Sequence, residues 1–325
     1  MDANQIREIA ASFRQSRILL SAVELDLFSH IEKAGTTSRQ LATRLHLNEH
    51  ACDRLLNALV SLGILTKEDP LFFNTPESFT FLSKNSPDFF GGLMHSNHLW
   101  DTWGHLTEVV RTGIPAHREE INDRGDEWLR AFILAMHDRA KKQAPFQLSG
   151  IDLSGIQTML DVGGGSGAFA MEFITRKPEI KATVFDLPQV VPITREFIQK
   201  EGYTNKITTY TGDYTRDELP KGFDLVFLSA VLHSNSLEVN QNLIRKCYNA
   251  LQQNGRIVIQ DWIMNNDRTE PAYGAIFAIN MMVGTEAGDC YTEQEVTAML
   301  QSAGFRHVSR VEFESGLSQV TAVKI

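Results

Sequence analysis

A glycine-rich turn stands out between residues 161 and 167, where the chain reads Asp-Val-Gly-Gly-Gly-Ser-Gly after a short apolar run. Glycine permits a tight strand-to-helix turn and lets a ligand approach the backbone closely. Gly163, Gly165 and Gly167 are therefore predicted to bind a nucleotide-type cofactor. The turn alone does not identify that cofactor, because Gly163-x-Gly165-x-x-Ala168 also satisfies the dinucleotide-binding pattern of NAD enzymes.

Further carboxylates follow the next two apolar runs. Asp186 comes about 20 residues after the glycines, where a carboxylate can accept hydrogen bonds from ribose hydroxyls. Gly212 and Asp213 end the third run, so that Asp213 can bind an adenine amino group while the Tyr214 ring lies beside the base. An ordinary Asx turn is the alternative interpretation of Asp213.

A histidine follows the fourth apolar run. Residues 223–228 lead into Ser-Ala-Val-Leu-His, which brings His233 to the edge of the sheet where ligands bind in open α/β folds. An imidazole can take a proton from a hydroxyl near neutral pH, so His233 is the candidate general base. Asp261, at the end of the fifth run, is predicted to orient the imidazole and to stabilise its charged form.

Alternating strands and helices must position these side chains. Strands are predicted at 158–162, 182–185, 207–210, 225–228 and 256–259, which implies a parallel, doubly wound, Rossmann-like sheet. Two further runs, 308–313 and 319–323, form a C-terminal antiparallel hairpin and bring the sheet to seven strands. This hairpin, together with Asp161 placed to receive an ammonium group, favours S-adenosylmethionine over a nicotinamide dinucleotide. Residues 151–325 are predicted to be the catalytic domain.

The first 95 residues have helical apolar spacing, and strand-like runs begin only after Gly63. Thr37 and Asn48 are predicted helix caps, and the order of elements is that of a winged helix. Nine Lys or Arg against eleven Asp or Glu leave this segment without the basic face that DNA binding needs. Residues 96–150 are predicted to be a helical connector that ends at the helix breakers Pro145 and Gly150.

Composition limits the partners. The 325 residues carry a net charge of -9, which disfavours nucleic acid and anionic membranes and leaves small molecules as the expected ligands. The N-terminus lacks the apolar core of a signal peptide, and no stretch approaches the roughly 20 apolar residues of a membrane span. Cys52, Cys247 and Cys290 form no metal pattern, so no metal site is expected. A cytoplasmic protein with reduced thiols is predicted.

With these motifs the chain resembles the dimeric S-adenosylmethionine-dependent O-methyltransferases, a family that includes plant caffeate and bacterial polyketide enzymes. Besides the glycine turn and the Leu-His pair, the resemblance rests on residues 185–188, 212–213, 292–295 and 303–305. It implies a homodimer formed through the winged-helix domain. It also implies that Leu187 binds the cofactor and that Met136 lies near the cofactor's methionine end.

Two positions depart from the family. The plant enzymes place a cofactor-contacting lysine four residues before the histidine, where this chain has Ser229, so Ser229 is expected to contact the cofactor less strongly. They also flank the base with two glutamates. Counted from His233, the first corresponds to Asp261 and the second to Cys290, so one carboxylate is kept and one is lost.

The predicted function is methyl transfer to a hydroxyl of a small aromatic or polyketide-like acceptor. Carbon methylation is the nearest alternative, and an NAD-dependent oxidoreductase and a ligand-sensing winged-helix regulator are more distant ones. Met and aromatic side chains of the connector and of the segment after the fifth strand are predicted to line the acceptor pocket, with core packing as the alternative. These residues are Trp100, Phe132, Asn280, Met281 and Met282.

Overall fold

The computed structural model describes residues 1–115 and 125–325, apart from the side chain of residue 127. The chain divides into two compact units, Met1–Trp100 and Asp101–Ile325. Part of the predicted connector, residues 116–124, lies outside the described residues. No helix formed by the described residues is long and apolar enough to cross a membrane.

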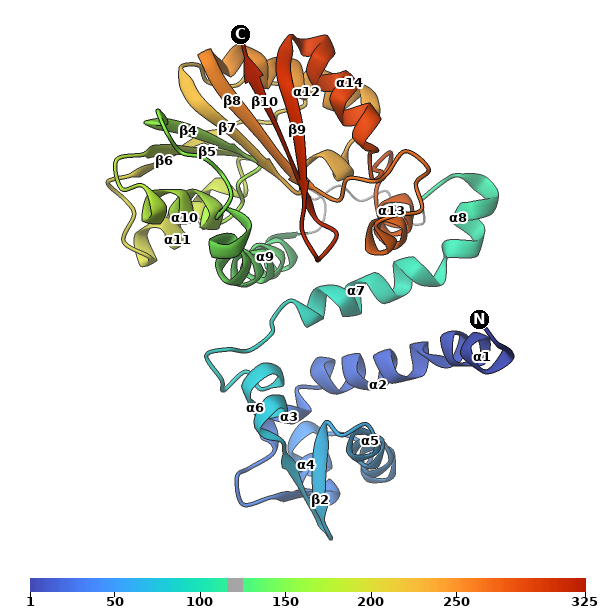
Figure 1. Ribbon diagram of the computed structural model, residues 1–325. Helices are drawn as coiled ribbons and strands as arrows, with labels where there is room; N and C mark the ends of the chain where they lie inside the picture. The colour runs from blue at the N-terminus through green and yellow to red at the C-terminus, as the bar shows by residue number, and fades with distance from the viewer. Residues whose placement is uncertain (116–124) are drawn as a thin grey trace. The chain divides into compact units, whose positions relative to one another are not determined.

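The first unit consists of short helices (Figure 1) and a small sheet, whose strand order is β1-β3-β2. Thr37 caps its fourth helix with a reciprocal bond to Gln40, and Asn48 caps the fifth, as the sequence predicts. Its elements are α1 (Ala3–Ala11), α2 (Phe13–Glu24), α3 (Leu27–His30), β1 (Thr36–Thr37), α4 (Ser38–Leu45), α5 (Glu49–Ser61), β2 (Leu65–Glu68), β3 (Leu71–Asn74) and α6 (Pro76–Leu82). The helix α7 (Leu93–Gly104) contains the boundary between the units.

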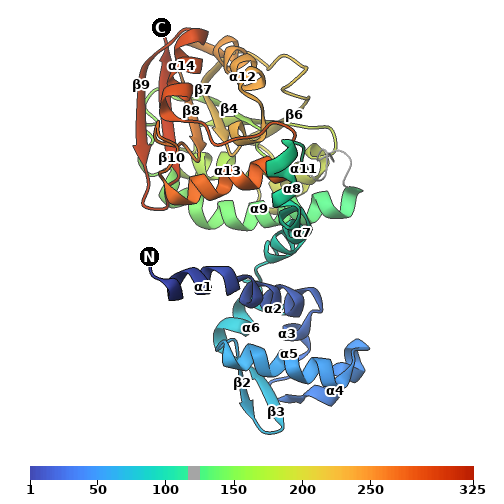
Figure 2. The ribbon, with the colours of Figure 1, turned by 90° about the vertical axis from the view of Figure 1, so that its right-hand side faces the viewer.

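The second unit contains the predicted seven-stranded sheet, in the order β6-β5-β4-β7-β8-β10-β9. The first five strands are parallel, and the last two form the antiparallel hairpin, with β9 at the edge (Figure 2). The strands are β4 (Thr158–Val162), β5 (Lys181–Asp186), β6 (Ile207–Thr211), β7 (Phe223–Ser229), β8 (Leu251–Asp261), β9 (Phe305–Glu312) and β10 (Ser318–Lys324). The prediction of a doubly wound sheet with a C-terminal hairpin is confirmed.

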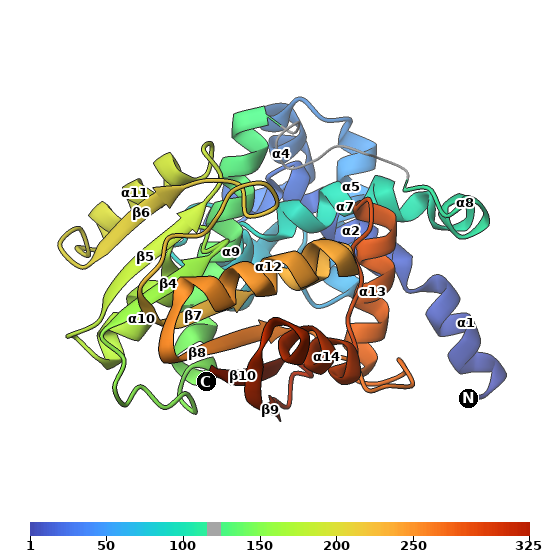
Figure 3. The same ribbon diagram turned by 90° about the horizontal axis from the view of Figure 1, so that it is seen from above.

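Helices cover both faces of this sheet (Figure 1). The helices of this unit after α7 are α8 (Leu106–Thr112), α9 (Gly125–Gln147), α10 (Ala168–Arg176), α11 (Val191–Lys200), α12 (Leu237–Ala250), α13 (Ala272–Gly284) and α14 (Glu293–Ala303). Helices α12 and α14 lie side by side on one face (Figure 3), and α10 and α11 pack on the other. Helices α9 and α13 lie at the end of the sheet to which β8 points (Figures 1 and 2).

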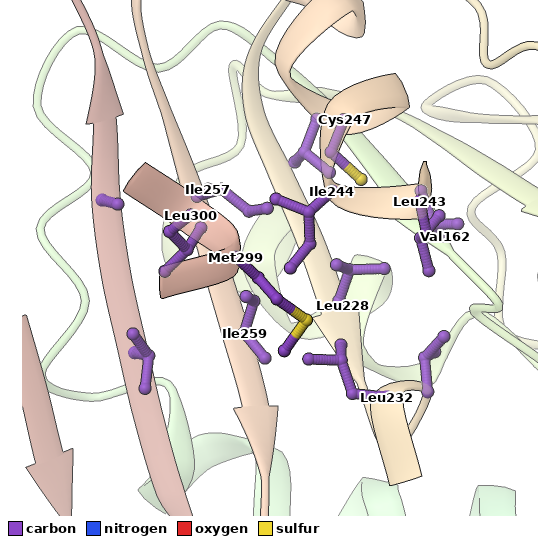
Figure 4. Packing of buried hydrophobic residues seen from close by; sticks show 14 of the residues in the cluster. Val162, Leu228, Leu232, Leu243, Ile244, Cys247, Ile257, Ile259, Met299 and Leu300 are labelled. Carbon is purple, nitrogen blue, oxygen red and sulfur yellow. The ribbon is translucent and has the colours of Figure 1, made fainter. Parts of the chain in front are cut away.

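One hydrophobic cluster joins the sheet to α12 and α14. Figure 4 shows Leu228 and Ile259 of the central strands interdigitating with Ile244 of α12 and Met299 of α14. All four side chains are buried, so this face is a well-packed support for the strand ends. A second cluster, around Phe173 and Phe227, fills the opposite face.

The connector ends between the two predicted helix breakers, since Pro145 lies in the last turn of α9 and Gly150 lies beyond its end. Helix α9 continues to Gln147, two residues beyond the proline. A proline lacks the N–H that would donate to the carbonyl four residues back, so α9 has one backbone hydrogen bond fewer in its last turn. The extra residues place Gln147 over the sheet, where it is buried.

Candidate active site

The order in which strands are added to the sheet reverses between β4 and β7, and the candidate site surrounds the carboxyl ends of these two strands. From β4 the chain adds β5 and β6 on one side, and then β7 and β8 on the other. Such a switch point opens a crevice at the carboxyl ends of the strands, where open α/β sheets bind ligands. The predicted glycine turn, His233 and Asp261 all lie at this edge.

Two glycines of the turn leave no room for a side chain. Gly163 has a φ of +67°, and a Cβ there would lie 2.9 Å from Val231 Cγ2. At Gly164 a Cβ would lie 2.7 Å from Asp161 Oδ2 and 2.9 Å from Val184 Cγ1. Both positions therefore require glycine, and the exposed backbone of the turn forms a cradle for a closely approaching ligand.

Asp161 is the buried carboxylate beneath this turn. Only 1% of the residue is exposed, and its Oδ2 has no hydrogen-bond partner among the described residues. Burial, with a smaller contribution from the charge of Asp186, raises the pKa of Asp161 to about 7. A buried carboxylate with an unused oxygen is suited to a cationic ligand group such as an ammonium.

Asp186 ends β5 and faces the same turn. Its Oδ2 accepts a hydrogen bond of 2.7 Å from the Gly165 N–H, and its Oδ1 accepts one of 2.8 Å from the Leu187 N–H. Burial raises its pKa to about 6 despite these bonds. Each carboxylate oxygen has a second lone pair, so Asp186 can still accept hydrogen bonds from the hydroxyls of a ribose.

The third predicted cofactor segment is arranged differently. Asp213 Oδ1 accepts bonds from the N–H and Oγ1 of Thr215, at 2.9 and 2.6 Å, which is the Asx-type turn weighed as the alternative. Gly212 is required by Phe185, whose ring atom Cζ would lie 2.6 Å from a Cβ there. Tyr214 packs against the core and donates to Asn235 Oδ1 at 3.2 Å. The adenine contacts of these residues stay a prediction.

His233 and Asp261 form a hydrogen-bonded pair, as the sequence predicts. His233 Nδ1 lies 2.7 Å from Asp261 Oδ1, and the His233 backbone N–H donates to Asp261 Oδ2 at 3.2 Å. Asp261 also accepts a 2.8 Å bond from the Trp262 N–H. The carboxylate is 2% exposed and the histidine side chain 12%. This geometry places the proton of the neutral imidazole on Nδ1 and leaves Nε2 free to accept a proton.

Aromatic side chains surround this pair. The Phe277 ring of α13 meets the His233 ring edge-on, with centroids 4.9 Å apart, and Trp262 lies 6.0 Å from Phe277. Cys290, at the position of the family's second glutamate, is 1% exposed in the same cluster. Burial, followed by the charges of Asp261 and Asp289, raises the pKa of the Cys290 thiol. The thiol is therefore neutral and cannot take the place of the missing carboxylate.

The segment between α13 and α14 packs against the backbone of His233. A Cβ at Gly288 would overlap the carbonyl oxygen of His233. Arg268 binds this segment at Asp289 Oδ2 and at the Cys290 carbonyl, at 3.0 and 3.1 Å. Tyr291 donates a 2.5 Å bond to the carbonyl of Asn235. None of these supports is recognisable in the sequence, because each depends on two loops meeting in space.

Helix α9 contacts the glycine turn. His137 Nδ1 lies 2.9 Å from Ser166 Oγ in the glycine turn, and its ring stacks on Phe197. Met136, the predicted neighbour of the cofactor, lies next to His137 on this helix and is half-buried. Phe132 stacks on Trp128 at 5.2 Å and packs against the same cluster as Leu187. Phe132 thus lies on the Leu187 side of the site.

The other predicted acceptor-pocket residues lie on α13 and α7. Asn280 Oδ1 accepts a 2.8 Å hydrogen bond from Trp103 Nε1, so its amide is held in place. Met281 is buried and Met282 is half-buried on the same helix. Trp100 belongs to the first unit, where the Arg17 guanidinium lies 5.4 Å from its ring. The contacts of these residues with an acceptor stay a prediction.

Ser229 ends β7, and its Oγ accepts a 3.0 Å hydrogen bond from Gln260 Nε2. The described residues contain no group of three or more His, Cys, Asp or Glu that could hold a metal ion. Cys52, Cys247 and Cys290 are free and buried. The site thus combines a glycine turn and buried carboxylates suited to a cationic nucleotide-type ligand with an imidazole whose free nitrogen can take a proton.

Comparison with protein families agrees with this geometry. The model of an O-methyltransferase domain matches residues 103–306, and that of an O-methyltransferase dimerisation domain matches residues 7–84. The 3-hydroxy-5-methyl-1-naphthoate 3-O-methyltransferase of Streptomyces sahachiroi is 32% identical over 316 residues, which are 95% of this chain and 91% of that protein. The tetracenomycin polyketide synthesis 8-O-methyl transferase TcmO of Streptomyces glaucescens is 30% identical, over 93% of this chain and 91% of that protein.

One similar solved structure contains a bound cofactor. Human N-acetylserotonin methyltransferase in complex with S-adenosylmethionine superposes with a TM-score of 0.87 at 27% identity. The match covers 100% of this chain and 98% of the human one.

Proposed function

Since the chain belongs to the family of O-methyltransferases with a dimerisation domain and uses S-adenosylmethionine as methyl donor, we propose that it methylates a hydroxyl of an aromatic, polyketide-like molecule with His233 as general base. The observation that carries this proposal is the 2.7 Å bond between His233 Nδ1 and Asp261 Oδ1. It fixes the tautomer in which Nε2 can take the hydroxyl proton.

The residues at the strand ends fit the methyl donor. When bound, S-adenosylmethionine supplies an electrophilic methyl group on a sulfonium centre. Asp161 would pair with its ammonium group, Asp186 would accept its ribose hydroxyls, and the backbone of the glycine turn would lie against it. Both carboxylates are held by the fold before the donor arrives, so binding needs little reorganisation.

His233 would remove the acceptor proton while Asp261 stabilises the imidazolium that forms. The Phe277 ring beside His233 limits the access of water and offers an apolar surface to a planar acceptor. Positioning two bound reactants can lower the barrier by up to about 7–11 kcal/mol, which is more than a general base contributes. Cys290 takes no part in the proton transfer.

The acceptor class rests on the relatives, two of which are named for a hydroxynaphthoate and for tetracenomycin polyketide synthesis. The test is a screen of phenolic polyketides and naphthoates with methyl-labelled cofactor, read by mass shift and by the position of the label. A label on oxygen of an aromatic hydroxyl is the expected result. A label on carbon or nitrogen, with no phenol accepted, would contradict the proposal.

Cofactor binding should release protons near pH 6.5. Without the cofactor, Asp161 with a pKa of about 7 is mostly protonated there, and pairing with an ammonium group favours its ionised form. The affinity for S-adenosylmethionine should therefore fall as the pH drops below about 7. Calorimetry in buffers of different ionisation enthalpy measures the released protons, and the Asp161→Asn variant should release fewer. An identical binding heat in all buffers would contradict this role of Asp161.

The same carboxylates give the cofactor-free protein a defined pH dependence. A raised pKa means that the folded state holds its protons more tightly than the unfolded state. The free energy of unfolding should therefore decrease as the pH rises from about 4 through 6 and 7, and bound cofactor should reverse much of this loss.

Gly288→Ala should displace His233 and lower turnover about tenfold or more, because the new methyl group overlaps the His233 carbonyl oxygen. Gly284→Ala is the matched control, since a Cβ at this last residue of α13 has nothing within 4 Å. Steady-state kinetics should separate the two variants, whereas S-adenosylmethionine affinity should be similar in both. Equal turnover in the two variants would show that the segment does not position the base.

The dimerisation-domain match supports a homodimer formed through residues 7–84. Sedimentation of the full chain tests this assignment. Three free cysteines suit a reducing compartment, which is the basis for proposing that the enzyme works in the cytoplasm.

A further inference from the structure

Three polar residues lie in register across neighbouring strands at the carboxyl end of the sheet. Ser229 of β7 pairs with Gln260 of β8, and Gln260 pairs with Gln319 of β10. Gln260 is 2% exposed and Gln319 is 6% exposed. Two buried amides in one sheet row are costly unless every polar group is hydrogen-bonded.

Gln147 covers this row from the last turn of α9. Gln319 Nε2 donates to the Gln147 backbone carbonyl at 2.9 Å and to Gln260 Oε1 at 2.8 Å. Gln260 Nε2 donates to Gln147 Oε1 at 3.1 Å and to Ser229 Oγ at 3.0 Å. The chain of hydrogen bonds therefore leads from α9 through β10 and β8 to the end of β7.

The donor and acceptor roles in this series of hydrogen bonds are fixed at Gln319. A backbone carbonyl can only accept, so Gln319 must present its Nε2 to Gln147. The second hydrogen of that nitrogen then points to the oxygen of Gln260, which turns both hydrogens of Gln260 Nε2 toward Gln147 and Ser229. No flipped amide satisfies the same contacts.

Ser229 Oγ is consequently an acceptor from Gln260, and its single hydroxyl hydrogen remains to be donated elsewhere. No side chain or carbonyl among the described residues accepts it. Ser229 is half-buried and stands at the end of β7, directly beside the end of β4 at the switch point. The available donor therefore lies at the switch point, where the cofactor is proposed to bind.

We propose that the glutamine chain positions the Ser229 hydroxyl to donate to the carboxylate of the methyl donor's methionine end, with Gln260 as the positioning residue. The inference rests on the cofactor placement proposed above. Asp186 lies on β5, on the far side of β4 from Ser229. If Asp186 binds the ribose of the cofactor, the methionine end of the cofactor extends across β4 toward β7. That end carries a carboxylate, which accepts hydrogen bonds and needs a donor.

The test compares S-adenosylmethionine with its decarboxylated analogue by calorimetry. Ser229→Ala should weaken binding of S-adenosylmethionine about tenfold or more, the usual effect of losing a hydrogen bond to a charged group. Binding of the decarboxylated analogue should change less than about twofold, because it has no carboxylate to lose contact with. An equal loss for both ligands, or no loss for either, would overturn the proposal.

Gln260→Met separates positioning from direct contact. This variant keeps the side-chain length and removes the donor to Ser229, so it should weaken S-adenosylmethionine binding in the wild-type background but add nothing in the Ser229→Ala background. Additive losses in the double variant would contradict the positioning role. Thermal unfolding with and without ligand verifies that each variant folds.

Failure of the proposed function would give a different result. If His233 is not the base, His233→Ala keeps its turnover while the ligand discrimination of Ser229→Ala is unchanged. If the cofactor placement is wrong, Asp186→Asn fails to weaken S-adenosylmethionine binding, and that result overturns the inference together with its premise.

Discussion

Replacing His233 with alanine should lower kcat by about 100- to 10,000-fold, the range that a positioned general base contributes. The structure gives the reason, because the imidazole is the group whose proton-accepting nitrogen is set by a buried carboxylate, 2.7 Å away. The dissociation constant for S-adenosylmethionine should stay within about twofold, since the carboxylates proposed to hold the donor lie on β4 and β5.

The control for this experiment is His50→Ala, which removes an exposed histidine from a helix of the first unit and should leave kcat unchanged. Wild-type turnover of His233→Ala on the true acceptor would exclude a general base at this position and favour transfer to an acceptor that needs no deprotonation.

The sequence predicts the catalytic unit well because buried parallel strands leave strong signals. Each central strand is a short apolar run, and the residues that follow the runs necessarily meet at one edge of the sheet. Asp161, Asp186 and His233 could therefore be located from the sequence. The close approach of His233 to Asp261 follows from the same rule, since β7 and β8 are neighbours.

Other parts of the site could not be predicted, because they depend on strand register and on contacts between distant loops. Gln260 and Gln319 are ordinary polar residues in the sequence, and only the register of β8 with β10 shows that they form one buried row. The contact between the Phe277 and His233 rings depends on where α13 lies after a loop, and no local sequence pattern specifies that position. The same holds for Gly288 behind the histidine.

The glycine turn does not identify its cofactor by itself. Its pattern fits two cofactors, and the residues of the turn are the same for both. The prediction of S-adenosylmethionine is confirmed by the family match and by the cofactor-bound human structure. The sequence feature that favours it is the C-terminal hairpin, with β10 between β8 and β9, because a dinucleotide fold does not require one. Features remote from the motif thus decided its interpretation.

Asp261→Asn should lower kcat by about 100-fold or more with little change in side-chain volume. The carboxylate accepts three hydrogen bonds, from His233 Nδ1 and the Trp262 N–H at Oδ1 and from the His233 N–H at Oδ2. An amide has one oxygen, so its NH2 group must face at least one of these donors. If it faces Nδ1, the imidazole proton moves to Nε2 and the histidine can no longer act as a base.

The other orientation of the amide introduced by Asp261→Asn also impairs catalysis. An NH2 group at the Oδ2 position opposes the His233 backbone N–H, which lies 3.2 Å from the carboxylate, and this repulsion shifts the base. A neutral amide in either orientation cannot stabilise the imidazolium. Asp267→Asn, at an exposed carboxylate six residues further on that accepts from the Thr269 N–H, is the control. If Asp261→Asn retained wild-type turnover while His233→Ala lost it, the base would work without its carboxylate, and the tautomer argument would be wrong.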